Sequence, residues 1–226
     1  MSELPPFTPN WDLSRVVDHL HDALHEREKE LLLEQAVYGI DSLDELQLHE
    51  LLAAHLSKHM CVSRESYYPS SAGNKRTHRM RCDLALTPLG RPLTLDYEPA
   101  GLFDPVNPAG PADALWVEVK VARQFRAPGE RHAGYGQQWR TSVVNDIKKI
   151  EGEPMIHEAA LLLIVFTEAD WVIEKDLDLF EDVLVQKEVL AGSRQVRHVK
   201  ISDRIGHTRA SVALWPTVAR HIDRGA

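Results

Sequence analysis

The spacing of hydrophobic positions changes several times along this chain, and each change marks an expected element. Residues 11–37 carry many charges around a run of leucines, which is typical of an amphipathic helix. A second helix is expected up to about residue 59, because four leucines fall on one face at helical spacing. Ser42, followed three residues later by Glu45, predicts a capping box at its start.

Shorter apolar segments bounded by glycine, proline and polar turns predict strands. The expected strands cover residues 62–68, 78–86, 115–121, 159–167, 196–201 and 209–214. The run at 159–167 is apolar at almost every position, which suits a strand buried on both faces. Further helices are expected at 137–151 and 177–190, and a long proline-rich loop at 87–113.

This order of elements predicts an α/β fold with a mixed central sheet flanked by helices. The chain has 226 residues, of which 43% are hydrophobic, enough for one sizeable core. We therefore expect a single domain over residues 1–226. Within it we expect an acidic helical arm at 1–40, a central core at 41–170, and a C-terminal helix with strands at 171–226.

Composition favours a cytoplasmic protein. The chain holds no run of about 18 apolar residues, so no membrane contact or span is expected. Its first residues lack the basic and apolar regions of a secretory signal. The two cysteines, Cys61 and Cys82, form no disulfide framework, which is typical of a reducing compartment.

The net charge of -8 is unevenly distributed. Residues 1–50 hold 12 acids and 3 bases, whereas residues 51–226 hold 22 acids and 23 bases. Two local stretches are basic, and their members are Lys75, Arg76, Arg79 and Arg81, and then Arg123, Arg126 and Arg131. Such stretches either contact nucleic-acid phosphates or form solvated loops, and both interpretations stay open here.

The candidate chemistry lies on two expected strands. Asp83 falls near the end of the strand at 78–86, and Glu118 and Lys120 stand two apart on the strand at 115–121. Residues two apart on a strand point to the same face, where a buried charged pair is costly unless it has a partner. A metal ion held by Asp83 and Glu118 beside Lys120 would provide one. The alternative is an exposed strand face with a cross-strand ion pair.

These residues resemble the motif of the PD-(D/E)XK nuclease superfamily, whose restriction-endonuclease-like core is helix, three-stranded meander, helix, strand. The family carries an acid at the end of the second strand and an acid-x-lysine on the third, which Asp83, Glu118 and Lys120 match. The resemblance covers about residues 43–167. The chain departs from the family by Cys82 in place of a proline, and by the 34 residues between Asp83 and Glu118, which require an insertion.

Further residues fit the same resemblance. The family often adds a Glu on the first helix, which Glu45 matches, and an Asp and a Lys on the helix after the motif, which Asp146 and Lys149 resemble. Glu65 follows an arginine on the first strand, as in stand-alone members. Each also has a structural interpretation: Glu45 as a capping residue, Asp146 and Lys149 as a helical ion pair, and Glu65 as a partner of a neighbouring arginine.

Phosphodiester hydrolysis needs an in-line water and neutralisation of phosphate charge, which a hard divalent cation supplies. We expect Mg²⁺ or Mn²⁺ on Asp83 and Glu118, with Glu45 and the backbone carbonyl of Val119 as further ligands. Lys120, with its pKa lowered near the metal, is expected to deprotonate or orient the water. Lys149 or Gln138 would hold a phosphate oxygen.

The sequence thus predicts a metal-dependent endonuclease. The resemblance implies DNA rather than RNA as substrate, and a role in defence, mobile elements or repair. The alternative is a catalytically silent module of the same fold that binds or assembles through its acidic helical surfaces. The acidic N-terminal helix is the expected contact for a second protomer or for a partner encoded in the same operon.

A second set of potential ligands stands apart from this motif. His55 and His59 lie four residues apart at helical spacing and offer two imidazoles to Zn²⁺. Because no second ligand pair is adjacent in the sequence, we expect these histidines to pack rather than to bind metal.

Overall fold

The computed structural model describes residues 11–71, 80–95, 107–140 and 142–219. Its centre is a six-stranded sheet with strand order β1-β2-β3-β6-β8-β7. These strands are β1 (Cys61–Tyr67), β2 (Arg81–Thr87), β3 (Leu115–Arg123), β6 (Glu158–Thr167), β7 (Gln195–Lys200) and β8 (Arg209–Ala219). Strands β3 and β6 run parallel, and the other neighbours are antiparallel. The expected α/β class with a mixed sheet is confirmed.

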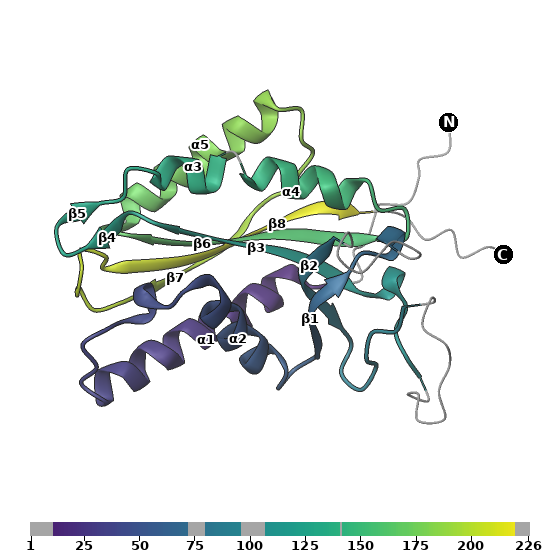
Figure 1. Cartoon of the computed structure of the whole chain (residues 1–226), viewed down its shortest axis with the longest axis horizontal. Coiled ribbons are helices and arrows are strands. Elements are labelled where there is room, and N and C mark those ends of the chain that lie inside the picture. The colour runs from purple at the N-terminus through teal and green to yellow at the C-terminus, as the bar shows by residue number, and fades with distance from the viewer. Residues whose placement is uncertain (1–10, 72–79, 96–106, 141, 220–226) are drawn as a thin grey trace.

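Helices cover both faces of the sheet. They are α1 (Leu13–Leu33), α2 (Glu45–Leu56), α3 (Tyr135–Arg140), α4 (Ser142–Glu151) and α5 (Asp170–Gln186). Figure 1 shows α1 and α2 below the sheet and α3, α4 and α5 above it. None of these described helices combines the length and the apolar character that a membrane crossing needs.

Strand β6 joins the two layers of core. All ten of its residues are buried, as its apolar run predicts. Leu162, Ile164 and Phe166 pack into the cluster that contains the buried faces of α1 and α2. Leu161 and Leu163 pack into the cluster formed with α3, α4 and α5. The alternation of side chains along a strand therefore divides one apolar run between two cores.

Helix α2 begins differently from the prediction. Its N-cap is Asp44, whose Oδ1 accepts the Gln47 N–H at 2.7 Å while the Gln47 side chain accepts the Asp44 N–H at 2.9 Å. The predicted capping box of Ser42 and Glu45 is wrong, because Ser42 belongs to a preceding 3-10 turn, η1 (Ile40–Ser42). Ser and Asp cap helices about equally well, so local preference did not separate them. Glu45 is thereby left without a capping role.

Helix α1 is integrated into the fold. Its apolar face, including Val17 and Leu24, is buried in the core beneath β7 and β8. On the flanks, Arg197 donates to Asp18 at 2.8 Å, and the buried Glu28 accepts from Arg204 at 2.9 Å. Within the described part of the expected acidic arm, the outward face of α1 thus remains for a partner.

Other boundaries shift for identifiable reasons. The helix predicted at 137–151 is divided into α3 and α4. Helix α5 begins at Asp170 rather than at 177, and its N-cap Ala169 offers no side-chain cap that would have marked the start. Strand β8 continues through Pro216, a residue that usually ends strands, with a register shift beside it: Ala160 pairs with Pro216 but Ala159 pairs with Val218, which leaves Thr217 as an extra residue in β8. Between β3 and α3 the chain forms a small hairpin of β4 (Phe125–Ala127) and β5 (Glu130–Arg131).

Candidate active site

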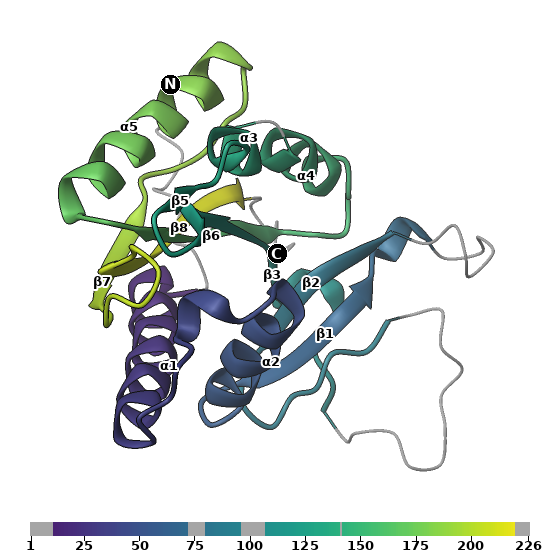
Figure 2. The ribbon, with the colours of Figure 1, turned by 60° about the vertical axis from the view of Figure 1, so that its left-hand side comes forward.

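The candidate site lies where β2 and β3 part. The two strands pair at only three positions, from Leu84 opposite Val117 to Leu86 opposite Leu115. Beyond them, Oδ2 of Asp83 accepts the Val119 N–H at 2.7 Å, in place of a backbone partner. The carboxyl group of Asp83 is therefore fixed between the strands. Figure 2 shows α2 beside β1 and β2 at this end of the sheet.

Glu118 occupies the buried side of this junction, with 2% of its surface exposed. Its Oε1 accepts hydrogen bonds from the Tyr68 hydroxyl and, at 2.7 Å, from Nζ of Lys149 on α4. Burial, followed by the nearby charge of Asp83, raises the pKa of Glu118 to about 7. Burial also raises the pKa of the Tyr68 hydroxyl far above its ordinary value, so Tyr68 remains a donor.

Asp83 and Glu118 form a coupled pair of carboxyl groups. Burial raises the pKa of Asp83, and burial together with the charge of Asp83 raises the pKa of Glu118. Raised pKa values in two neighbouring carboxyl groups favour a proton on one of them when no cation is bound. Metal ions compete with that proton, because carboxylate ligands must be deprotonated to bind.

Lys120 leaves β3 on the same face as Glu118, as their spacing predicts. Its Nζ lies 3.2 Å from Oδ2 of Asp146 on α4 and 4.0 Å from Oε1 of Glu45 on α2. Burial alone would lower the pKa of Lys120, but the charges of Asp146 and Asp83 outweigh it and raise the pKa. The expected lowering refers to the site with a metal bound; without a metal, three carboxylates surround the ammonium group and raise its pKa.

Glu65, which the resemblance included, and His49, which it did not, face Asp83 from the other side. Glu65 lies between the pairs Arg64–Leu84 and Ser66–Cys82 of β1 and β2, which places it opposite Asp83, and it has a left-handed φ of 50°. Its Oε2 also lies 3.8 Å from Nη1 of Arg81, as the structural interpretation expects. Ligand atoms of His49, Glu65 and Asp83 all lie within 4.8 Å of one another. Opposed carboxylates on neighbouring strands repel each other. A cation between them would remove this repulsion.

The donor set fits a divalent cation. Nε2 of His49 is buried without a hydrogen-bond partner among the described residues, although such atoms are normally satisfied. A ring nitrogen of His49 lies within 4.8 Å of carboxylate oxygens of Asp83 and Glu65, and the charge of Asp83 acts on the neighbouring Glu118. Nε2 of His49 lies 3.9 Å from Oε1 of Glu45. Carboxylates suit Mg²⁺ and Mn²⁺, and an imidazole adds affinity for transition metals. The residues that would hold the ion are therefore Asp83, Glu118, Glu65 and His49.

Replacing His49 by glutamine is expected to weaken Mn²⁺ binding by about tenfold or more, the scale that loss of one supporting group produces in metal sites. Mg²⁺, which prefers oxygen ligands, should lose less. Isothermal titration calorimetry with each ion measures how far its affinity falls from the native chain to His49→Gln. The His25→Gln variant on α1 is the control. Equal losses for both ions would contradict a role of His49 as a nitrogen ligand.

The predicted auxiliary residues are partly engaged elsewhere. Oε1 of Gln138 accepts the Arg123 N–H at 3.0 Å, at the end of β3. The Arg123 guanidinium donates to the carbonyl oxygens of Asp41, at 2.8 Å, and Leu43. These contacts anchor the segment before α2 to β3, so Gln138 and Arg123 support the fold near the site. Lys149, in contrast, contacts the site directly through Glu118.

Two of the predicted nucleic-acid contacts, Arg123 and Arg126, line a neighbouring cavity. A cavity of about 830 Å³ is lined by Arg123, the exposed Arg126, Gln138 and Gln47, but not by the paired carboxyl groups. Arg131 is paired with Glu168 at 2.9 Å. Lys75, Arg76 and Arg79 lie outside the described residues. Arg126 is thus the described cation that faces this cavity from an exposed position.

The described residues bring together Asp83, Glu118 and Lys120, with Lys149 and Glu45 at their margin. Burial, two carboxyl groups with raised pKa values and an imidazole nitrogen without a hydrogen-bond partner among the described residues make this cluster suited to hold a divalent cation. Function has to be argued from this geometry, because the chain matches no family model, no curated protein and no solved structure.

Proposed function

We propose that this protein is a metal-dependent nuclease of the PD-(D/E)XK type that hydrolyses phosphodiester bonds, with DNA as its expected substrate. One observation carries the proposal. Asp83 and Glu118, on neighbouring strands, are two adjacent carboxyl groups whose pKa values are raised by burial, and the charge of Lys120 lies close to Asp83. Carboxyl pairs with raised pKa values next to a lysine are more characteristic of a cation site than of a purely structural contact.

The order of elements supports the proposal. Helix α2 precedes the antiparallel meander of β1, β2 and β3; α3 and α4 follow, and β6 then pairs with β3 in parallel. This is the helix, meander, helix, strand order of the superfamily core. Asp83 lies on the second strand, and Glu118 and Lys120 lie on the third, as the motif requires.

Each of the site's side chains has a distinct role in the proposed reaction. A cation held by Asp83 and Glu118 would supply charge neutralisation at the phosphate and a polarised water. Because its pKa is raised, Lys120 remains an ammonium group, so we infer that it donates to the attacking water or to a phosphate oxygen rather than acting as a base. Asp146 holds this ammonium group in position from α4.

Lys149 has a complementary role. Its Nζ contacts Glu118 at 2.7 Å and lies 3.7 Å from Asp146. Tyr68 donates to the same Glu118 oxygen from the interior. These two donors fix the orientation of the Glu118 carboxylate, which leaves its other oxygen for Asp83 and the cation. Such outer partners set the geometry of metal ligands.

Cleavage of labelled linear duplex DNA, single-stranded DNA and RNA tests the function, with Mg²⁺, Mn²⁺ or EDTA present. Glu118→Gln removes a ligand charge while keeping the shape, so we expect metal-dependent cleavage by the native chain and none by this variant. Asp182→Asn, an exposed change on α5, is the matched control and should cleave normally. Cleavage that survives in Glu118→Gln would contradict the proposal. Absence of cleavage and of Mn²⁺ binding in the native chain would favour the silent binding module.

A further inference from the structure

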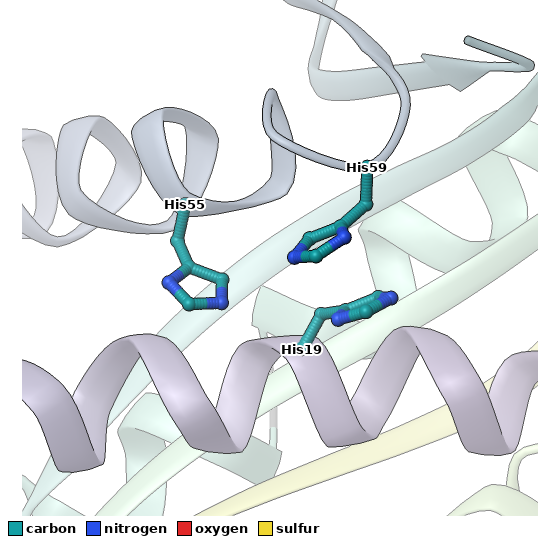
Figure 3. A group of neighbouring side chains, drawn as sticks. All are labelled: His19, His55 and His59. Carbon is teal, nitrogen blue, oxygen red and sulfur yellow. The ribbon is translucent and has the colours of Figure 1, made fainter.

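Three histidines meet between α1 and α2, away from the candidate active site. His19 lies on α1, His55 on α2 and His59 just beyond the end of α2, and Figure 3 shows their rings gathered in the space between the two helices. One ring nitrogen from each lies within 4.8 Å of the others. The rings of His19 and His59 are stacked, with centroids 3.8 Å apart, and His55 lies 5.7 Å from His59.

The His55 ring is oriented by a carboxylate. Its Nδ1 lies 3.3 Å from Oε2 of Glu26 on α1, and the imidazole itself is buried. A proton on Nδ1, donated to Glu26, leaves the lone pair on Nε2 of His55. Histidines that bind metals are commonly held by a carboxylate at their other nitrogen in this way.

The imidazoles are suited to bind as neutral ligands. Burial lowers the pKa of His19 and of His55, and the neighbouring cations Arg15 and Lys58 lower these pKa values further. Neutral imidazole is the form that coordinates a metal. Among the described residues, neither His19 nor His59 has a hydrogen-bond partner that would occupy its ring nitrogens.

A cavity adjoins the cluster. It measures about 390 Å³ and is lined by His19, His59, Arg15, Met60 and Arg91. A metal ion bound by three imidazoles would therefore have room on one side for a further ligand. Sites with three protein ligands and one open position are typical of zinc that binds water or a substrate.

We propose that His19, His55 and His59 bind one Zn²⁺, with a water molecule in the fourth position on the side of the cavity. The three nitrogen donors suit Zn²⁺, which accepts imidazole in tetrahedral geometry. To bind one ion together, the stacked rings of His19 and His59 have to turn so that a nitrogen of each points at it. The bound ion would link α1 to α2. This site is separate from the proposed nuclease site, and the proposal does not depend on nuclease activity.

The experiment uses the full chain without a histidine tag, stripped of metal by a chelator and then titrated with Zn²⁺ in excess Mg²⁺. We expect one Zn²⁺ per chain, and weaker binding by about a hundredfold in His19→Gln and in the exposed His59→Gln. Co²⁺ in place of Zn²⁺ should give the visible absorption of a tetrahedral site. The His25→Gln variant, which changes another histidine of α1, should bind as the native chain does.

Circular dichroism of each variant checks that it is folded, so that lost binding is not mistaken for unfolding. His59→Gln is the substitution least able to disturb the fold, because His59 is exposed and follows the end of α2. Native affinity in both His19→Gln and His59→Gln would overturn the proposal, as would the absence of Zn²⁺ binding by the native chain. Loss of Zn²⁺ binding in Glu118→Gln but not in the histidine variants would also overturn it, because Zn²⁺ would then occupy the carboxylate site.

Discussion

Replacing Lys120 by methionine is expected to slow DNA cleavage by about a hundred- to a thousandfold, the usual cost of removing one donor that stabilises charge in a transition state. Methionine retains the length of the side chain but removes its charge. Because Asp83 and Glu118 remain, binding of Mn²⁺ should persist. Single-turnover cleavage gives the rate, and titration with Mn²⁺ gives the affinity.

The matched control is Lys148→Met, an exposed lysine on α4 next to the site lysine Lys149. It should cleave at the native rate. The fold should also survive Lys120→Met, because Asp146 retains Lys149 within 3.7 Å. A variant that unfolds readily but cleaves normally when folded would mean that Lys120 is a structural ion pair, and would refute its part in the chemistry.

The metal-free protein is expected to lose stability as pH rises from 5 to 8, by about 2–3 kcal/mol through Glu118 alone. Glu118 has an ordinary pKa of 4.5, raised in the folded chain to about 7, so the folded state binds the proton more tightly. Its stabilising effect is therefore complete below the ordinary pKa and is lost as pH rises through 7. Denaturant unfolding in EDTA at several pH values measures the effect.

Glu118→Gln isolates this contribution, because glutamine fills the same space and does not titrate in this range. The variant should show a flatter dependence on pH than the native chain and should be the more stable of the two at pH 8. Added Mn²⁺ should stabilise the native chain most at pH 8, where it no longer competes with a proton on Glu118. If the free energy of unfolding depends on pH in the same way in the native chain and in Glu118→Gln, Glu118 ionises normally in the folded state.

Much of the fold was predictable because the strongest patterns are local. The apolar run of β6 and the spacing of Glu118 and Lys120 depend only on the periodicity of strands. The predicted starts of two helices were wrong where the capping signals in the sequence were equivalent or missing. Ser42 and Asp44 are equivalent cap candidates before α2, and Ala169 before α5 has no capping side chain. Pro216 gave a misleading signal, because β8 continues past it with a register shift at the neighbouring Thr217.

The rest of the candidate site depends on contacts between distant segments. Tyr68 reaches Glu118 across 50 residues, and its position at the end of a strand gave no indication of this. His49 lies on the same helix as Glu45, yet only the packing of α2 against β1 shows that it faces Asp83. Likewise, the spacing of His55 and His59 in the sequence marks them as a pair. The sequence gives no sign that α1 packs against α2 and brings His19 to them.

The bond between Asp83 and Val119 has a consequence for observation by hydrogen exchange. The Val119 amide is protected by a side chain rather than by a strand, so its exchange with deuterium reports on one carboxylate. Neighbouring amides of β3 pair with β6 along the full strand and exchange only when the sheet opens. Comparing the two rates would separate movements of the Asp83 side chain from opening of the sheet, within a single strand and without any added label.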